Sequence, residues 1–260
     1  MNIPKRPIII IPSRLASLRL PNKPLAKIKG EPMIVLCMKR ALEADLGPVV
    51  VACGDQEIYS VVHSAGGQAV MTNPSHRSGS DRIFEAFSLI DPDEKHDCII
   101  NFQGDMPTIH PGIIRAVLDP MVDGDVEIST LVAEIKSESE ISDLNVVKAV
   151  VGIEKGQKIG RAIYFSRADV PSGSGPKYHH IGLYAYRPAS LKKFVRLPKG
   201  VLETRESLEQ LRALEHGLRI DAALVDTLPL GVDTLADLES ARRYYKQKHN
   251  IKIKGIEIND

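Results

Sequence analysis

Basic side chains are concentrated near the start of the chain, and most of them follow four consecutive isoleucines at positions 8–11. Seven basic residues precede the first acidic residue, Glu31: Lys5, Arg6, Arg14, Arg19, Lys23, Lys27 and Lys29. Because the formal net charge at pH 7 is only +1, the remainder of the chain is acidic. Ser13, Pro21 and Pro24 separate the basic residues and are typical of a turn. Cations concentrated after a buried strand predict a pocket for a phosphorylated ligand, and the alternative is a solvated basic segment.

Two aspartates follow predicted strands farther along the chain. Asp105 comes after the apolar residues 98–102, and Asp233 comes after a strand expected at 220–225. Ligands of an open parallel sheet bind outside the carboxyl ends of its strands, so these segments are expected to converge on the basic loop. Carboxylates beside Arg and Lys suit a Mg²⁺ ion that bridges a nucleoside triphosphate. Singly, Asp105 could be a turn residue and Asp233 a helix N-cap, but their joint placement favours metal binding.

The phosphate-binding motifs of other enzyme classes are missing from the sequence. Neither G-x-x-x-x-G-K-[ST] nor G-x-G-x-x-G occurs. This argues against a P-loop kinase or ATPase and against a nicotinamide dehydrogenase. Phosphates would therefore be held by side chains and by the backbone of the loop after the first strand.

Strands and helices alternate through the first half of the chain, which predicts a parallel sheet covered on both faces. Strands are expected at residues 7–11, 49–52, 68–71 and 98–102. Helices are expected from Pro32 to the stop at Gly47-Pro48, from an Asp55 cap to Ala65, over 80–90, and from Pro111 onward. We therefore expect an α/β fold with a Rossmann-like, mostly parallel sheet flanked by helices.

The pattern changes from about residue 126, where strands follow one another with little helix between them. They are expected at 128–135, 146–151, 162–165 and 181–186, with a mobile lid or surface hairpin around 172–175. This predicts an antiparallel β lobe at about 126–204, inserted in or packed beside a core of about 1–125 and 205–250. A helix is expected at 205–218, and a last helix begins at Thr234, whose spacing to Asp237 suits a capping box. The whole chain, 1–260, is expected to be one domain.

The composition fits a soluble globular enzyme, with 43% hydrophobic and 26% charged residues. Aromatic residues make up 5% of the chain and Trp is missing, which with the acidic remainder disfavours nucleic-acid binding. Cys37, Cys53 and Cys98 have no C-x-x-C spacing and are expected to be reduced core residues. No apolar run is long enough for a signal-peptide core or a membrane span, so we expect a cytoplasmic protein without a membrane partner.

Seven sequence blocks, in order and across nearly the whole chain, resemble the 3-deoxy-manno-octulosonate (Kdo) cytidylyltransferases, a branch of the nucleotide-sugar-forming nucleotidyltransferases. The blocks are PSRLASLRLPNKPL at 12–25, HRSGSDR at 76–82, NFQGD at 101–105, YFSR at 164–167, HIGLY at 180–184, LEQLR at 208–212 and GVDT at 231–234. The first block marks only the broader group. The blocks around Tyr184 and Glu209 point to the Kdo branch.

The resemblance implies a nucleotide-diphospho-sugar transferase-like fold and a specific reaction. CMP would pass from CTP to the anomeric hydroxyl of Kdo, with release of pyrophosphate and with Mg²⁺ as cofactor. The product would supply activated Kdo for lipopolysaccharide synthesis. The resemblance also implies a homodimer, in which the antiparallel lobe would bind the sugar and form the dimer contact.

The resemblance also assigns roles at the phosphate end of the site. Arg14 and Lys23 match the catalytic cations that hold the triphosphate, and Arg19 matches a second phosphate-side arginine. Ser13 is expected beside them as a substrate-binding residue. Asp105 and Asp233 match the carboxylates that hold Mg²⁺. Such cations would offset the charge that builds on the leaving pyrophosphate during in-line attack.

Further matched positions are expected to bind the nucleoside and the acid sugar. The segment lining the cytosine and ribose side comprises Ser78, Gly79 and Arg82, and its alternative is a helix-capping turn. The positions that match sugar contacts are Gln103, Arg167, His180, Tyr184, Glu209 and Gln210. A sugar that carries a carboxylate and several hydroxyls suits one Arg with mixed donors and acceptors. The alternatives are a half-buried sheet surface for His180 and Tyr184, and solvent-facing helix residues for the last two.

The chain departs from the family at three places. Asn22 stands where Gly is usual, although Asn tolerates positive φ better than most residues. Met106 stands where many relatives carry Glu, so no role of that carboxylate transfers. The loop at 172–175 replaces a Trp-containing stretch. The same reaction on 8-amino-Kdo or a sialic acid is an alternative, as is a sensor that binds CTP without turnover. Lys23 and the two aspartates weigh against the sensor.

Overall fold

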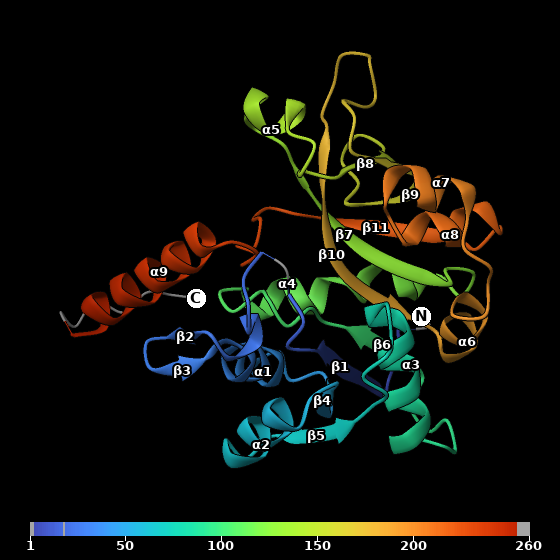
Figure 1. Cartoon of the computed structure of the whole chain (residues 1–260). Coiled ribbons are helices and arrows are strands. Elements are labelled where there is room, and N and C mark those ends of the chain that lie inside the picture. Colours follow the sequence, from blue (N-terminus) through green and yellow to red (C-terminus); the bar gives the residue numbers. More distant parts are fainter. Residues whose placement is uncertain (1–2, 18, 254–260) are drawn as a thin grey trace.

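The computed structural model describes residues 3–17 and 19–253. Within these residues, nine strands form one sheet in the order β5-β4-β1-β6-β10-β7-β11-β9-β8 (Figure 1). A second, two-stranded sheet is formed by β2 (Lys27–Ile28) and β3 (Glu31–Pro32). Two 3₁₀ turns, Lys23–Leu25 and Asp119–Val122, interrupt the loops.

One half of the large sheet is parallel and is covered by helices on both faces. Its strands are β5 (Gln68–Met71), β4 (Val49–Cys53), β1 (Pro7–Ser13) and β6 (Cys98–Asn101). Its helices are α1 (Met33–Glu43), α2 (Gln56–Ser64), α3 (Gly79–Ile90) and α4 (Pro111–Ala116). Ile9 and Ile11 pack with α1, α2 and α4, whereas Ile8 and Ile10 pack with α3. The run of isoleucines is therefore a strand buried on both faces, and the α/β class is confirmed.

The other half of the sheet is mainly antiparallel and closes on itself. Its strands are β10 (Tyr178–Tyr186), β7 (Ile128–Glu134), β11 (Ile220–Val225), β9 (Ile159–Ser166) and β8 (Lys148–Gly152). β8 pairs with β9 and also with β10, so these five strands form a closed ring. β10 also pairs with β6, which makes the predicted antiparallel lobe a continuation of the parallel sheet. β11, from the C-terminal part of the core, lies between β7 and β9.

The single helix predicted over residues 205–218 is wrong, because the chain forms two short helices there. α7 (Val201–Glu206) ends at Ser207, whose φ is 56°, and α8 (Gln210–Glu215) follows. The leucine spacing still marks the buried face, since Leu208 and Leu211 both lie in the core. Two further short helices are α5 (Glu138–Ser142) and α6 (Pro188–Phe194).

The last helix, α9 (Leu235–Ile253), begins where the sequence predicts. Asp237 N donates to Thr234 Oγ1 at 3.3 Å and Thr234 N donates to Asp237 Oδ2 at 2.8 Å, so the predicted capping box is confirmed. None of the helices in the described part of the chain combines the length and the apolar character that a membrane span requires.

The three cysteines are free and buried, as predicted. Burial raises the pKa of Cys53 and of Cys98 to about 12, so both remain thiols at neutral pH.

Candidate active site

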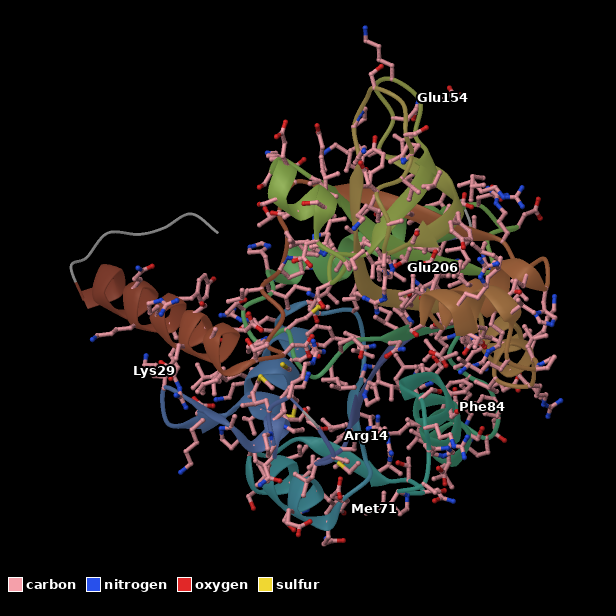
Figure 2. The ribbon with its side chains drawn as sticks, turned by 45° about the horizontal axis from the view of Figure 1, so that its top comes forward. Arg14, Lys29, Met71, Phe84, Glu154 and Glu206 are labelled. Carbon is pink, nitrogen blue, oxygen red and sulfur yellow. The ribbon has the colours of Figure 1, made fainter. Side chains whose placement is uncertain are left out.

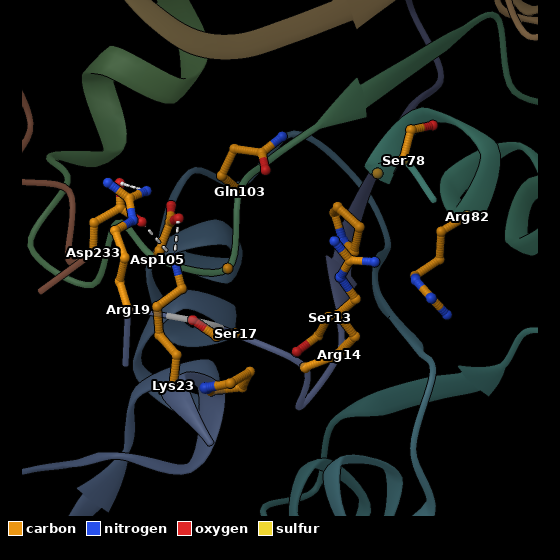
Figure 3. Close-up of a pocket in the computed structure, with 15 residues that line it drawn as sticks. Ser13, Arg14, Ser17, Arg19, Lys23, Ser78, Arg82, Gln103, Asp105 and Asp233 are labelled. Carbon is orange, nitrogen blue, oxygen red and sulfur yellow. Dashed lines mark hydrogen bonds and ion pairs between the residues drawn. The ribbon is translucent and has the colours of Figure 1, made fainter. Parts of the chain in front are cut away.

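A pocket of about 590 Å³ lies at the carboxyl ends of β1 and β6 (Figure 3). Its lining includes ten of the residues assigned from the sequence: Ser13, Arg14, Arg19, Lys23, Ser78, Gly79, Arg82, Gln103, Asp105 and Asp233. Pro12, Ala16, Ser17, Pro24 and Gly104 also line it and were not predicted. Four of these five carry no polar side chain, so their types indicated no chemistry.

Gly104 lies where the segment after β6 passes close to the end of β1. A Cβ at this position would lie 3.2 Å from Ile34 Cδ1 and 3.4 Å from Pro12 O. The backbone before Asp105 can therefore run against the end of β1, which brings the segment after β6 next to the basic loop.

The basic loop after β1 is held by contacts from other segments. Leu15 N donates to Asp55 Oδ2 at 2.8 Å, and Arg14 Nη1 donates to His76 O at 3.3 Å. Asn22 has φ 55°, so the turn before Lys23 keeps its left-handed residue without glycine, as expected. The predicted side-chain cap by Asp55 is wrong: this residue is at the N-cap position of α2, but its carboxylate accepts from Leu15 instead.

Lys23 lies between two carboxylates at one end of the pocket (Figure 3). Its Nζ donates to Asp105 Oδ2 at 2.7 Å and to Asp233 Oδ1 at 3.0 Å. Arg19 Nη2 lies 2.9 Å from the other oxygen of Asp233. Burial disfavours the charged form of Lys23, but Asp105 and Asp233 outweigh this effect and raise the pKa of Lys23 above its ordinary value. Lys23 is therefore an ammonium at neutral pH.

Asp105 and Asp233 fit a Mg²⁺ ion as a pair. Both accept a hydrogen bond from one ammonium, so they are close enough to converge on one ion. Among the residues that the structure describes, no group of three or more His, Cys, Asp or Glu side chains is placed to hold a metal. Mg²⁺ commonly keeps waters and substrate phosphate oxygens beside one or two carboxylates, which suits this donor set. Met106 packs against core residues and supplies no third carboxylate.

Arg82 and Ser13 place buried polar atoms on the side of the pocket away from Lys23 (Figure 3). Arg82 Nη1 donates to Thr72 Oγ1 at 2.6 Å and to Asn73 O at 3.3 Å. Within the described residues, Arg82 Nη2 and Ser13 Oγ are buried without a hydrogen-bond partner. Burial, and then the charge of Arg14, lower the pKa of Arg82. Because buried polar atoms are nearly always paired, these two are suited to hydrogen-bond a ligand.

Ser78 and Gly79 begin helix α3 at the edge of the pocket. Ser78 Oγ accepts from Asp81 N at 3.0 Å and donates to Asp81 Oδ2 at 2.8 Å. Ser78 is thus the helix cap that the alternative interpretation described, and it also lines the pocket. A Cβ on Gly79 would lie 3.4 Å from Pro12 Cγ, which is ordinary contact.

The remaining sugar-side residues lie outside the pocket lining, on β10, directly after β9, or at the start of α8. They are Arg167, His180, Tyr184, Glu209 and Gln210. The rings of His180 and Tyr184 are neighbours, with centroids 5.4 Å apart, although a bulge in β10 separates them along the strand.

His180 is a neutral hydrogen-bonding residue in this group. Its Nε2 lies 3.0 Å from Thr130 Oγ1, and that hydroxyl can give its single proton to Leu183 O at 2.9 Å. Nε2 of His180 must then donate, which leaves Nδ1 as a hydrogen-bond acceptor. Burial lowers the pKa of His180 to about 3, and the neighbouring His179 adds to the effect.

Tyr184 and Glu209 connect this group to the phosphate pocket. Tyr184 is opposite Asn101 in the β10–β6 pair, and Gln103 Nε2 donates to Asn101 Oδ1 at 3.1 Å. Glu209 Oε2 accepts from Ser80 Oγ, at the start of α3, at 2.8 Å. Burial raises the pKa of Glu209 and that of Tyr184. The structure therefore brings Tyr184, Glu209 and Gln103 into one region beside the pocket.

Arg167 is held by the segments around it and does not line the pocket. Its Nε donates to Glu206 O at 3.0 Å, and its Nη1 donates to Leu144 O at 3.0 Å. Glu206, labelled in Figure 2, also accepts from Arg167 N at 3.0 Å. Buried Lys148 donates to the carbonyl of Arg167 at 2.7 Å. Sequence reasoning missed Glu206 and Lys148, since neither belongs to a recognisable motif.

Gln210 is buried at the start of α8, and its Nε2 is without a partner in the described part of the chain. The alternative interpretation of Gln210 as a solvent-facing helix residue is therefore wrong.

Comparison with known proteins identifies the fold and the protein family. The mixed sheet resembles that of a nucleotidyl transferase from Methanothermobacter, with a TM-score of 0.58 at 15% identity, which shows the fold alone. The sequence model of the cytidylyltransferase family matches residues 8–220. The chain therefore belongs to the cytidylyltransferase family.

Relatives narrow this to one branch of the family. The chain is 61% identical over 240 residues to the 3-deoxy-manno-octulosonate cytidylyltransferase of Paramagnetospirillum magneticum, covering 92% of this chain and 98% of the relative. It is 57% identical to the protein of the same name from Rhodospirillum centenum, covering 92% and 93%. A solved structure of CMP:2-keto-3-deoxy-manno-octonic acid synthetase complexed with CTP superposes with a TM-score of 0.86 at 36% identity, covering 94% of this chain and 99% of that one.

Proposed function

We propose that this chain transfers CMP from CTP to the anomeric hydroxyl of Kdo and releases pyrophosphate. The observation that carries the proposal is the position of Lys23, hydrogen-bonded to both Asp105 and Asp233 at one end of the pocket. Cations that can bind a triphosphate therefore lie in direct contact with carboxylates that can bind its metal ion. The relatives and the CTP complex described above support this choice of substrates.

The reaction is a single in-line displacement. The anomeric oxygen forms a bond to the α-phosphorus and its proton is released to solvent. The bond between that phosphorus and the bridging oxygen breaks, and pyrophosphate leaves with the electron pair. Arg14, Arg19 and Lys23 offset the negative charge that collects on the leaving group.

Asp105 and Asp233 would hold Mg²⁺, which when bound withdraws charge from the α-phosphate and orients it. Other residues of the chain bind the nucleoside and the sugar. Arg82 and Ser13, with their unpaired buried atoms, hydrogen-bond the nucleoside end of CTP. His180, Tyr184 and the residues near them bind the sugar, with the neutral imidazole accepting from a hydroxyl.

Two further features belong to the proposal. The protein works in the cytoplasm and supplies activated Kdo for lipopolysaccharide synthesis. It forms a homodimer through the antiparallel part of the sheet, where Ile159 and Ile163 on β9 are 40% and 60% exposed. Sedimentation velocity would show a dimer, and a monomer at micromolar concentration would contradict this part.

A substrate matrix tests the proposal. Pyrophosphate release would be followed with CTP, UTP, ATP or GTP against Kdo, 8-amino-Kdo or a sialic acid, with Mg²⁺ or with EDTA. We expect release with CTP and Kdo in Mg²⁺, and loss of that release in EDTA. CTP binding without release from any sugar would indicate a sensor and contradict the proposal. Release that is insensitive to EDTA would remove the metal role.

A further inference from the structure

Helix α9 contacts each of the three segments that supply Lys23, Asp105 and Asp233. In Figure 1 it lies beside β2 and β3, at the side of the molecule away from α6 and α8. Leu238 and Ala241 are buried in the same core as α1, so the helix is docked on the body of the protein. Among the residues of α9 whose side chains the structure describes, none lines the pocket, whereas Asp233, two residues before the helix, does.

The first contact is with the segment that carries Asp105. Tyr245 OH donates to Pro107 O at 2.6 Å, two residues beyond the aspartate. The ring of Tyr245 packs against core residues, and the Arg40 guanidinium lies 5.9 Å from its centroid. The packed ring of Tyr245 therefore places its hydroxyl against the carbonyl of Pro107.

The second contact is with Asp233 itself. Asp237 Oδ2 accepts from Asp233 N at 3.1 Å, from Thr234 N at 2.8 Å and from Thr234 Oγ1 at 2.8 Å. A capping box needs only the second of these bonds. The bond to Asp233 N extends the cap to the backbone of the proposed metal ligand.

The third contact is with the segment that follows Lys23. Arg242 Nε and Nη2 both donate to Lys27 O, at 3.0 and 2.8 Å, and Lys27 begins β2 just after the 3₁₀ turn that carries Lys23. The two aspartate segments are also joined directly, because Val232 N donates to Asp105 O at 2.8 Å.

We propose that α9 is a clamp that sets the spacing of the carboxylates of Asp105 and Asp233, with Tyr245 and Asp237 as positioning residues. The inference rests on the proposed function, because it takes these carboxylates as metal ligands. Neither positioning residue lines the pocket. Asp237 holds the backbone of Asp233, and Tyr245 holds the chain two residues beyond Asp105. Groups that hydrogen-bond a metal ligand directly commonly change metal affinity 10- to 100-fold, so contacts to the backbone should give the lower end of that range.

The test compares Tyr245→Phe with Tyr244→Phe. Both substitutions remove one hydroxyl and keep the ring, and the two rings contact each other with centroids 5.6 Å apart. Tyr244 is 38% exposed, and among the described residues no hydrogen bond is formed by its hydroxyl. The readouts are Mn²⁺ binding in the presence of CTP, followed by electron paramagnetic resonance, and the Mg²⁺ concentration for half-maximal pyrophosphate release.

We expect Tyr245→Phe to weaken Mn²⁺ binding about tenfold and to raise the Mg²⁺ requirement by a similar factor, with the KM for Kdo unchanged. Tyr244→Phe should match the unmodified protein in both readouts. Equal Mn²⁺ binding by all three proteins, or no Mn²⁺ binding by any, would overturn the clamp. If the unmodified protein releases no pyrophosphate, the proposed function is contradicted. This result differs from one in which pyrophosphate is released but Tyr245→Phe has no effect, which contradicts only the role of α9.

Discussion

Lys23 hydrogen-bonds two carboxylates that stand 82 and 210 residues away along the chain. At the scale of the residue, this arrangement follows from simple electrostatics. A partly buried ammonium is stable only beside negative charge, and two carboxylates that face each other need a cation between them. The cations Arg19 and Lys23 therefore balance the charges of Asp105 and Asp233. When CTP and a metal ion bind, the phosphates of CTP can replace the carboxylates as partners of the cations, and the metal ion can replace the cations as partner of the carboxylates.

Asp105→Asn and Asp233→Asn should each lower turnover about 100-fold or more while the protein stays folded. The amide keeps the shape of the carboxylate but removes a charged metal ligand, and metal coordination contributes several kcal/mol to catalysis. Steady-state rates and circular dichroism would measure the two effects. Asp226→Asn, at an 87% exposed side chain outside the pocket, is the control. A near-normal rate for either variant would refute that residue as a ligand.

Gly79→Ala tests the nucleoside end of the pocket. The fold has room for the added methyl group, so the free energy of unfolding should not fall. If CTP lies against this turn, its KM should rise about fivefold, which corresponds to about 1 kcal/mol of binding free energy. Gly173→Ala, in an open loop with nothing within 4 Å, is the matched control. An unchanged KM for CTP would place the nucleotide elsewhere.

At the scale of the element, the turn directly before Lys23 depends on a left-handed residue. Asn22 has φ 55° directly before Lys23. Glycine adopts this conformation freely, whereas it costs an ordinary L-residue about 1–2 kcal/mol. The turn therefore determines where the ammonium of Lys23 lies.

Asn22→Gly should leave turnover intact, whereas Asn22→Val should destabilise the fold by about 1–2 kcal/mol and raise the KM for CTP. Urea unfolding and steady-state kinetics would measure both effects. A valine variant with normal stability and normal kinetics would show that the turn does not control Lys23.

Most elements could be predicted from the sequence because their patterns are local. The isoleucine run, the caps at Thr234 and Ser78, and the stop at Gly47-Pro48 need no distant partner. The prediction of a single helix at 205–218 was wrong because the regular spacing of leucines does not reveal that the helix ends at Ser207. The carboxylate of Asp55 was assigned to the wrong partner, because its true one, Leu15 N, lies 40 residues away.

At the scale of the whole molecule, closure of the ring of strands was not predictable. β8 pairs with both β9 and β10, and such a choice of partners depends on contacts between distant segments. The convergence of Lys23 with the two aspartates could be predicted, since it follows from the general geometry of parallel sheets. The sugar-side residues were found only through family resemblance, because a His and a Tyr on a strand have no distinctive pattern.

Acid should destabilise the folded protein partly through His180. Its pKa is about 3 in the fold, and an exposed histidine has a pKa of about 6.5. Between these values the unfolded chain binds a proton that the folded chain does not, so stability is lost as pH falls from about 6.5 toward 3. His180→Asn removes this effect, and its destabilisation should therefore be smaller at pH 5 than at pH 7, by at most about 2 kcal/mol. Urea unfolding of both proteins at the two pH values measures it, and an unchanged difference would show that His180 titrates normally.

The central claim is that CMP becomes bonded to the anomeric oxygen of Kdo. The most direct measurement is a ³¹P spectrum of a reaction with CTP, Mg²⁺ and Kdo carrying ¹³C at its anomeric carbon. We expect a new phosphodiester signal that is split by coupling to the labelled carbon and that grows together with pyrophosphate. Pyrophosphate without a split signal, or neither product, would contradict the account.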